Sequence, residues 1–176
     1  DTGKNVNSLV ISADGWSIVA GSDNDDIIFW HRNGSTPVWE YDTGYNVILV
    51  DITADGNYVV AATEDHRAYL FDTDEDNWSN QKYLWRYSTG GLPNGIDISD
   101  NGYSVAIATD DKLIFIDVSG HHEGDSVSVK WEQGFSMEDK VLCVATSSDG
   151  EYIVAGTSYD TEDEQESKVY LFGRDS

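Results

Sequence analysis

Carboxylates at alternate positions near the middle of the chain come closest to a known chemistry, that of a calcium-binding loop. Asp72, Asp74 and Asp76 stand two residues apart, as the first oxygen ligands of such a loop do. The loop also requires a glycine and a bidentate glutamate at fixed later positions, and Asn77 and Tyr83 stand there instead. The spacing therefore favours a solvated acidic loop, and we expect no metal ion.

A second group of metal-ligand types, His121, His122, Glu123 and Asp125, lies in a short polar segment. It lacks two histidines spaced one helical turn apart, so an exposed loop is favoured over a transition-metal site. The sequence also lacks a nucleophile elbow, a phosphate-binding glycine loop and a dinucleotide-binding glycine motif. We therefore expect no catalytic residue, no cofactor and no enzyme activity.

The net charge of the chain limits the classes of partner that it can bind and bears on its cellular location. Ten Lys+Arg against 33 Asp+Glu give a net charge of −23, which disfavours nucleic acid and anionic membrane surfaces. No apolar run approaches the roughly 18 residues that span a bilayer, so membrane insertion is not expected. With 39% hydrophobic and 12% aromatic residues the chain can bury a core. Such acidity is typical of proteins in salty water and favours an extracellular or cell-surface location.

An internal repeat dominates the sequence. A tetrapeptide of the type Ser/Thr-x-Asp/Asn-Gly occurs four times, with its glycines 41, 46 and 48 residues apart. Counted from that glycine, an apolar residue precedes it by six positions and an apolar run begins three positions after it. A third apolar run follows, and three units add a segment that carries Trp39, Trp85 or Trp131. We expect one domain of four repeats, at 1–41, 42–87, 88–133 and 134–176.

Each repeat is typical of four short strands. The Asp-Gly or Asn-Gly pair predicts a tight hairpin, because glycine accepts a positive φ. The second strand is apolar at successive positions, which indicates burial on both faces. Sheets of this kind shield one another when they stack radially. We therefore predict an all-β fold, a β-propeller of four four-stranded antiparallel blades, in which the recurrent tryptophans pack between blades.

The single cysteine, Cys143, excludes an intrachain disulfide. Its neighbours Leu142 and Val144 indicate a strand. We therefore expect Cys143 to be a small, buried core residue.

The repeat resembles the WD40-like and quinoprotein-like (PQQ-type) propeller repeats of secreted bacterial and archaeal proteins. The likeness lies in the order of four motifs, Ser-Ala-Asp-Gly, Ile-Val-Ala-Gly, Tyr-Leu-Phe and Leu-Trp-x-Tyr-x-Thr-Gly. The likeness covers the whole chain and is most specific at 39–44 and 85–90. The third unit departs from it, because Trp131 is not followed by the Tyr and Thr. The Trp-Asp and Gly-His pairs of intracellular WD40 repeats are also missing. The resemblance implies a propeller used for binding or scaffolding and supplies no cofactor residues.

The chain ends where the outer strand of the last repeat would begin, so the repeats predict 4 × 4 − 1 = 15 strands. The last blade would lack its outer strand, and an unpaired apolar edge seeks a partner. Three explanations stay open: an excerpt of a longer propeller, copies that complete one ring or join head to tail, and a closed four-bladed monomer. The start at Asp1, without a Met or a signal peptide, indicates an excerpt or a removed leader. The expected edge consists of Val169, Tyr170, Leu171 and Phe172.

Together these patterns predict a non-catalytic extracellular scaffold or interaction protein that assembles into a surface layer or filament by strand complementation. Its partners would be other copies of itself or further propeller repeats. The alternative is a ligand- or protein-binding propeller domain of a larger secreted sensor or assembly factor, with a protein or glycan partner. Asn33 and Asn77 begin N-glycosylation sequons and are the expected glycan sites.

Overall fold

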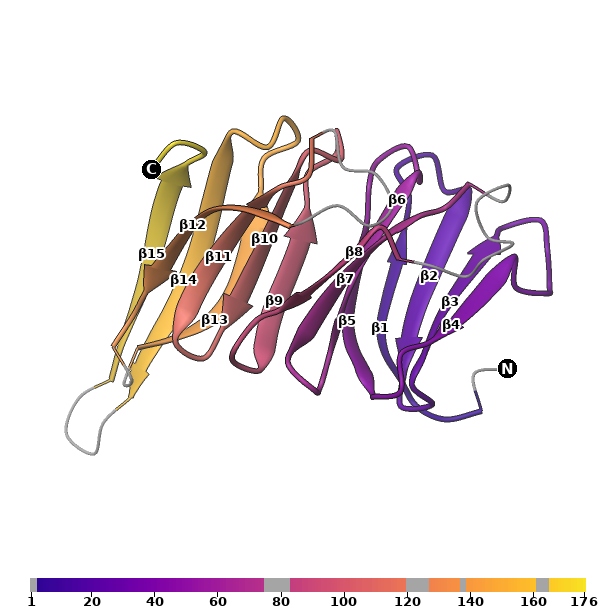
Figure 1. Ribbon diagram of the computed structural model, residues 1–176, viewed down its shortest axis with the longest axis horizontal. Helices are drawn as coiled ribbons and strands as arrows, with labels where there is room; N and C mark the ends of the chain where they lie inside the picture. The colour runs from indigo at the N-terminus through magenta and orange to yellow at the C-terminus, as the bar shows by residue number, and fades with distance from the viewer. Residues whose placement is uncertain (1–2, 75–82, 120–126, 137–138, 161–164) are drawn as a thin grey trace.

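The computed structural model describes residues 3–74, 83–119, 127–136, 139–160 and 165–176, and these residues form fifteen β-strands (Figure 1). The strands build four antiparallel sheets, and within each sheet they follow one another in sequence order. None of the described residues belongs to a helix capable of crossing a membrane. The predicted all-β architecture is confirmed.

The first three sheets have four strands each and the last has three. The first contains β1 (Val6–Ile11), β2 (Ser17–Ser22), β3 (Asp26–His31) and β4 (Trp39–Asp42). The second contains β5 (Val47–Ile52), β6 (Tyr58–Thr63), β7 (Arg67–Asp72) and β8 (Trp85–Ser88). The third contains β9 (Pro93–Ile98), β10 (Ser104–Thr109), β11 (Lys112–Asp117) and β12 (Ser128–Gly134), and the fourth contains β13 (Asp139–Thr146), β14 (Tyr152–Asp160) and β15 (Gln165–Gly173).

The repeated tetrapeptide closes the turn between the first two strands of every sheet. In the first sheet the Ser12 hydroxyl donates to Asp14 Oδ1 at 2.6 Å, and the same oxygen accepts the Trp16 N–H at 2.9 Å. The Ser12 hydroxyl oxygen also accepts the Ser17 N–H at 2.9 Å. Gly15 then takes a φ of 69°, as the sequence predicts, because a side chain there would be strained. The other three turns repeat this arrangement.

The second strand of each internal sheet is buried on both faces, as its uninterrupted apolar pattern predicts. Every residue of β10 is buried, and in β6 only the first is partly exposed. Val59 of β6 belongs to the core shared with the first sheet, whereas Val60 belongs to the core shared with the third. Successive residues therefore serve two different neighbouring sheets.

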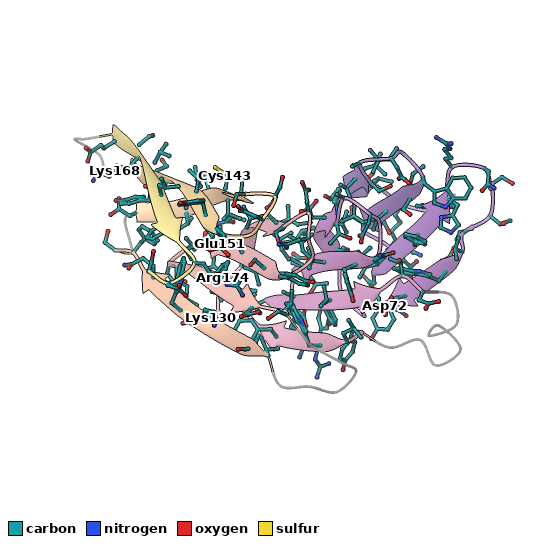
Figure 2. All side chains as sticks on the ribbon, turned by 90° about the horizontal axis from the view of Figure 1, so that it is seen from above. Asp72, Lys130, Cys143, Glu151, Lys168 and Arg174 are labelled. Carbon is teal, nitrogen blue, oxygen red and sulfur yellow. The ribbon has the colours of Figure 1, made fainter. Side chains whose placement is uncertain are left out.

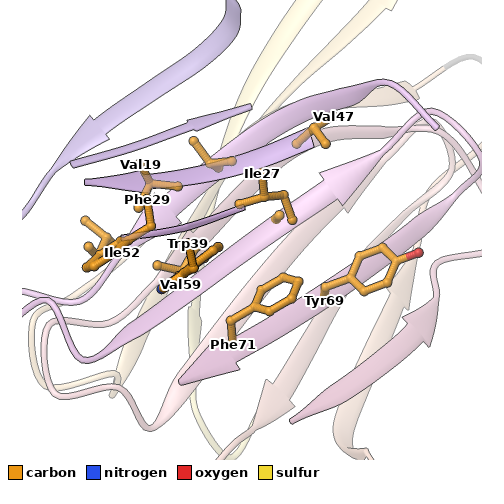
Figure 3. Close-up of a cluster of buried hydrophobic side chains, with 11 residues drawn as sticks. Val19, Ile27, Phe29, Trp39, Val47, Ile52, Val59, Tyr69 and Phe71 are labelled. Carbon is orange, nitrogen blue, oxygen red and sulfur yellow. The ribbon is translucent and has the colours of Figure 1, made fainter. Parts of the chain in front are cut away.

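Aromatic side chains fill the spaces between the sheets (Figure 3). The Trp39 ring stacks on Phe29 at 5.1 Å and lies 5.8 Å from Phe71 of the second sheet. The Trp131 ring stacks on Phe115 at 5.3 Å and lies equally close to Phe172 of the last sheet. The predicted role of the recurrent tryptophans in packing between blades is confirmed.

The four sheets follow one another along an arc (Figure 2). Their first strands are neighbours in space, β1 beside β5, β5 beside β9 and β9 beside β13. The first and last sheets lie at opposite ends of the array (Figure 1). Each end of the arc therefore presents one face of a sheet that has no neighbouring sheet among the described residues.

Candidate interaction surfaces

The last sheet exposes an apolar face at one end of the arc. This C-terminal end face consists of Cys143, Tyr152, Val154, Val169 and Leu171, which lie on the side of the sheet that faces away from the third sheet. Val169 is 78% exposed and Leu171 is 71% exposed. Exposure of adjacent large apolar groups on this scale marks a docking surface in folded proteins.

The first sheet exposes a second apolar surface at the other end of the arc. This N-terminal end face consists of Val6, Leu9 and Ile11, all on β1. Leu9 is 66% exposed and Ile11 is 56% exposed. Both end faces therefore carry side chains of the kind that form the interior of the array.

Equivalent residues of the second sheet are buried. Counted from the turn glycine, the equivalents of Val6, Leu9 and Ile11 in the second sheet are Val47, Val50 and Ile52, and none of these three is more than 7% exposed. The equivalents of Val154, Val169 and Leu171 in that sheet are Val60, Ala68 and Leu70, and none of these is more than 2% exposed. What distinguishes the end faces is the lack of a neighbouring sheet in the part of the chain that the structure describes.

The structure corrects the expectation for Cys143, which is exposed rather than buried. Its neighbour Val141 is buried completely against the third sheet. Cys143 pairs with Gly156 and points to the opposite side, onto the C-terminal end face. The strand assignment was right, but Cys143 lies on the face of the last sheet that no other described sheet covers.

The expected blade-completing edge, Val169 to Phe172, lies on β15, the outer strand of the last sheet. Its residues alternate between two environments. Tyr170 contacts Phe135 with ring centroids 5.3 Å apart, and Phe172 contacts Trp131, so both face the third sheet. Val169 and Leu171 face outward. The last sheet therefore offers a partner two features: the backbone edge of β15, which is unpaired among the described residues, and the exposed apolar side chains on its outward face.

Two aspartates on the inner strands connect the sheets. Asp51 Oδ2 on β5 accepts the backbone N–H of Ile98 on β9 at 2.8 Å. Asp97 Oδ2 on β9 accepts the backbone N–H of Thr146 on β13 at 2.7 Å, and it also accepts the Thr146 hydroxyl. Both aspartates stand five residues before their turn glycine, and the pair was missed in the sequence. Their one signal was a carboxylate between two apolar residues at the same position of two repeats.

The protonation of these two carboxyls is unusual. Burial, together with the neighbouring Asp97 carboxylate, raises the pKa of Asp51 from 3.8 to about 7. Burial also raises the pKa of Asp97, although hydrogen bonds from Thr146 oppose the rise. The two side chains interact with one another, so they titrate as a coupled pair. All their described partners are structural groups of the chain.

A polar cluster joins the third sheet to the fourth on the outer side of the arc. The Asp117 carboxylate accepts Arg174 Nη2 at 2.9 Å and lies 3.3 Å from Lys130 Nζ. Burial opposes ionisation there, but hydrogen bonds from Ser119 and Arg174 hold the pKa of Asp117 well below its usual value. The backbone carbonyl of Arg174 also accepts the Trp131 indole N–H at 3.1 Å.

A cleft of about 500 Å³ lies between the turns of the first two sheets, with Trp16, His31, Asp55, Tyr58 and Asp72 among its lining residues. The Trp16 ring already contacts the His31 ring at 5.1 Å and the Arg32 guanidinium at 5.5 Å. The aromatic surface of the cleft is thus engaged by groups of the chain itself.

The acidic and histidine motifs do not form a described metal site. Asp72 Oδ1 accepts the backbone N–H of Asp74 at 2.9 Å, whereas Asp76 lies outside the described residues. The His121–Asp125 segment also lies outside them. Within the described ranges, no three His, Cys, Asp or Glu side chains gather where they could hold a metal ion.

The two glycan candidates differ in what the structure describes. Asn33 is exposed in the loop between β3 and β4, where a glycan would meet solvent. Asn77 lies outside the described residues. Glycosylation at both positions stays a prediction.

The fold is that of the β-propeller class. The chain is similar in structure to a chain of hydrazine synthase from Kuenenia stuttgartiensis, with a TM-score of 0.72 and 17% identity, over 96% of this chain and 46% of that one. It is also similar to a chain of a mitotic checkpoint complex, with a TM-score of 0.67 and 16% identity, over 94% of this chain and 48% of that one. The chain thus spans about half the length of either propeller protein. No family model and no curated protein matches the sequence, so the fold is shown while the WD40 or PQQ repeat family stays a resemblance.

Proposed function

We propose that this chain is a non-catalytic scaffold that binds protein through its two end faces. The observation that carries the proposal is the contrast at equivalent positions: Leu171 is 71% exposed, whereas Leu70, its equivalent in the second sheet, is 2% exposed. Burying apolar area of this kind contributes about 25 cal/mol per Å², which makes sheet faces effective docking surfaces.

The absence of catalysis is part of the proposal. The raised pKa of Asp51 is the feature that comes closest to an active-site signal. Its carboxylate, however, accepts a backbone N–H from the next sheet and contacts Asp97, which is the arrangement of a structural clamp. A structural role for this pair explains the geometry without a substrate.

We place the scaffold outside the cell or on its surface. The net charge of −23 suits a saline environment, and the exposed Asn33 sequon is accessible to glycan transfer. Assembly into a surface layer or filament through β15 agrees with its position at the edge of the last sheet. The alternative is a ligand- or protein-binding domain of a larger secreted sensor or assembly factor, for which the cleft near Trp16 offers a second surface.

Light scattering over a range of protein concentrations tests the scaffold. We expect the wild-type chain to associate, and we expect Leu171→Asp or Leu9→Asp to weaken association at least tenfold, because each buries a charge in an apolar contact. Tyr103→Asp is the matched control, since Tyr103 is 51% exposed in the turn before β10 and belongs to neither end face. A wild-type chain that stays monomeric at every concentration, with no response to either substitution, would overturn the proposal.

A further inference from the structure

The geometry points to a second copy of this chain as the occupant of both end faces. In this arrangement the C-terminal end face of each copy packs on the N-terminal end face of the other, and two arcs of four sheets close into a ring of 2 × 4 = 8 sheets. The inference rests on the proposed function, because it names the partner of the same end faces. It is argued from three kinds of contact between adjacent sheets, and at each end of the array one half of each contact has no partner among the described residues.

The first contact seats two apolar side chains on a small residue of the preceding sheet. A Cβ built on Gly21 of β2 would lie 2.5 Å from Val47 Cγ1 and 3.2 Å from Val50 Cγ1, so only glycine leaves them room. The equivalent of Gly21 in the last sheet is Gly156, on the C-terminal end face. The equivalents of Val47 and Val50 in the first sheet are Val6 and Leu9. Val6 and Leu9 of one copy would therefore face Gly156 of the other, where Cys143 Sγ of that copy already lies 2.8 Å from the Cβ position.

The second contact places a side chain over the turn glycine of the following sheet. Tyr58 Cδ2 lies 3.0 Å from where a Cβ on Gly102 would stand, and Ser104 Oγ lies 2.5 Å from the same point on Gly150. Gly15 has no such cover, because the nearest atom to its missing Cβ is Cδ1 of Ile11 at 3.8 Å. The residue equivalent to Tyr58 in the last sheet is Tyr152, which is 56% exposed. Tyr58 covers Gly102 of the following sheet. In the same way, Tyr152 of one copy would cover Gly15 of the other.

The third contact joins the inner strands. A Cβ on Gly95 of β9 would lie 3.1 Å from Val144 N and 3.3 Å from Val144 Cγ1 on β13. At the first junction Ser8 Oγ, at the position equivalent to Gly95, accepts the backbone N–H of Val50 at 3.1 Å. The corresponding residue of the last sheet is Cys143. Its neighbour in a second copy would be Leu9, which is the equivalent of Val50 and Val144.

Self-complementarity favours a second copy over an unrelated protein. One chain carries both halves of the same contact, one half at each end, so a second copy supplies the missing half to both. None of the residues that define the two end faces is charged. A contact between them therefore leaves no carboxylate buried without a partner, despite the net charge of −23 per copy.

The curvature favours closure over an open filament. Head-to-tail contacts form a ring when the rotation closes and a fibre when it does not. The four sheets already follow an arc (Figure 2), and the chain superposes over 96% of its length on 46% of one propeller chain. Two arcs related by a twofold axis would each supply about half of a ring.

A designed disulfide tests this arrangement. In the variant Leu9→Cys, diamide takes two hydrogens from a pair of thiols to form one S–S bond between position 9 of one copy and Cys143 of the other. We expect a single crosslinked species of 2 × 19.5 = 39 kDa on a non-reducing gel, with intact mass showing two disulfides and peptide mapping showing the 9–143 link. The double variant Leu9→Cys/Cys143→Ser should give no such link, and Thr36→Cys, in the exposed loop after β3, should give none to Cys143.

The outcomes separate the ring from the scaffold. A ladder of dimers, trimers and longer species would overturn closure, because it shows an open chain of head-to-tail contacts. Association that is sensitive to Leu171→Asp but yields no 9–143 link would overturn this arrangement of copies and leave the scaffold function standing. A chain that is monomeric in solution and yields no link would overturn both.

Discussion

Asp97 on β9 accepts the backbone N–H of Thr146 on β13 at 2.7 Å, and so a carboxylate of one sheet holds the inner strand of the next. Asp51 does the same for Ile98 one junction earlier, at 2.8 Å. Because the two carboxyls also contact each other, the second, third and fourth sheets are joined by a single titratable pair. The stability of the array should therefore depend on pH around neutrality, which is unusual for aspartate.

The first prediction concerns that dependence. Folding raises the pKa of Asp51 from 3.8 to about 7, so the folded state binds this proton more tightly than the unfolded state does. Its contribution to stability is then complete at acidic pH and is lost as the pH rises through about 7. We expect the free energy of unfolding to fall by roughly 1–3 kcal/mol between about pH 5 and pH 8. Urea unfolding monitored by tryptophan fluorescence measures the change.

Two variants test the cause. Asp51→Asn should remove most of this slope, since the amide carries no proton to lose. Asp23→Asn is the control, because hydrogen bonds from Asn7 and Asn5 lower the pKa of Asp23. Any effect of Asp23 on the free energy of unfolding therefore changes at acidic pH, and the slope between about pH 5 and pH 8 should stay as in the wild type. A slope that survives in Asp51→Asn would assign the dependence to other groups.

The second prediction compares two glycines of similar backbone conformation. Gly44 has a φ of 78° and nothing within 4 Å of a built Cβ, whereas Gly150 has a φ of 70° and Ser104 Oγ at 2.5 Å. Gly44→Ala should cost about 1–2 kcal/mol for the strained φ alone. Gly150→Ala should cost about 1–3 kcal/mol more, because the methyl group also separates two sheets. Equal losses in denaturant unfolding would show that the turn glycine is needed for its φ only.

The third prediction concerns the polar contact between the last two sheets. Arg174→Ala removes a hydrogen bond of 2.9 Å to the buried Asp117 carboxylate, and we expect a loss of about 1–2 kcal/mol. Lys168→Ala is the matched control, since Lys168 pairs only at an exposed site with Glu166, at 2.8 Å, and such pairs contribute about 0–1 kcal/mol. Thermal unfolding that ranks the two variants in the reverse order would contradict the structure.

The fourth prediction uses the natural thiol. Cys143 is exposed on the C-terminal end face, so it should react readily with a maleimide in the monomer. Association through the end faces should slow this reaction, and added salt should slow it further, because salt screens the repulsion between two chains of charge −23. In the Leu171→Asp variant the reaction should stay fast at all protein concentrations. A rate that is independent of concentration in the wild type would show that the thiol is not covered.

The fold could be predicted from the sequence because its signals are local and repeated. The turn glycines, the hydroxyl two residues before each Asp or Asn, and the uninterrupted apolar second strands all act within one hairpin. The recurring tryptophans also predicted packing between the sheets, since one position repeated in three units indicates one structural role.

The surfaces were harder to predict because they depend on neighbouring sheets. Cys143 lies in a strand that resembles its internal equivalents, and only its place in the last sheet exposes it. The same holds for Leu9, whose equivalent Val50 is 7% exposed. The contact between Asp51 and Asp97 joins residues 46 positions apart, and no pattern within either strand predicts it.

Adjacent sheets contact one another through the same set of positions, so the junctions are equivalent in their architecture. A gene that encodes such a chain can gain or lose a whole unit by recombination and keep the positions of its contacts, so that only the side chains at the new junction must adapt to one another. Changes in length by fractions of a unit would instead bring unmatched surfaces together. Related chains should therefore differ in size by multiples of one unit, and the diameter of the assembled object should evolve in discrete steps.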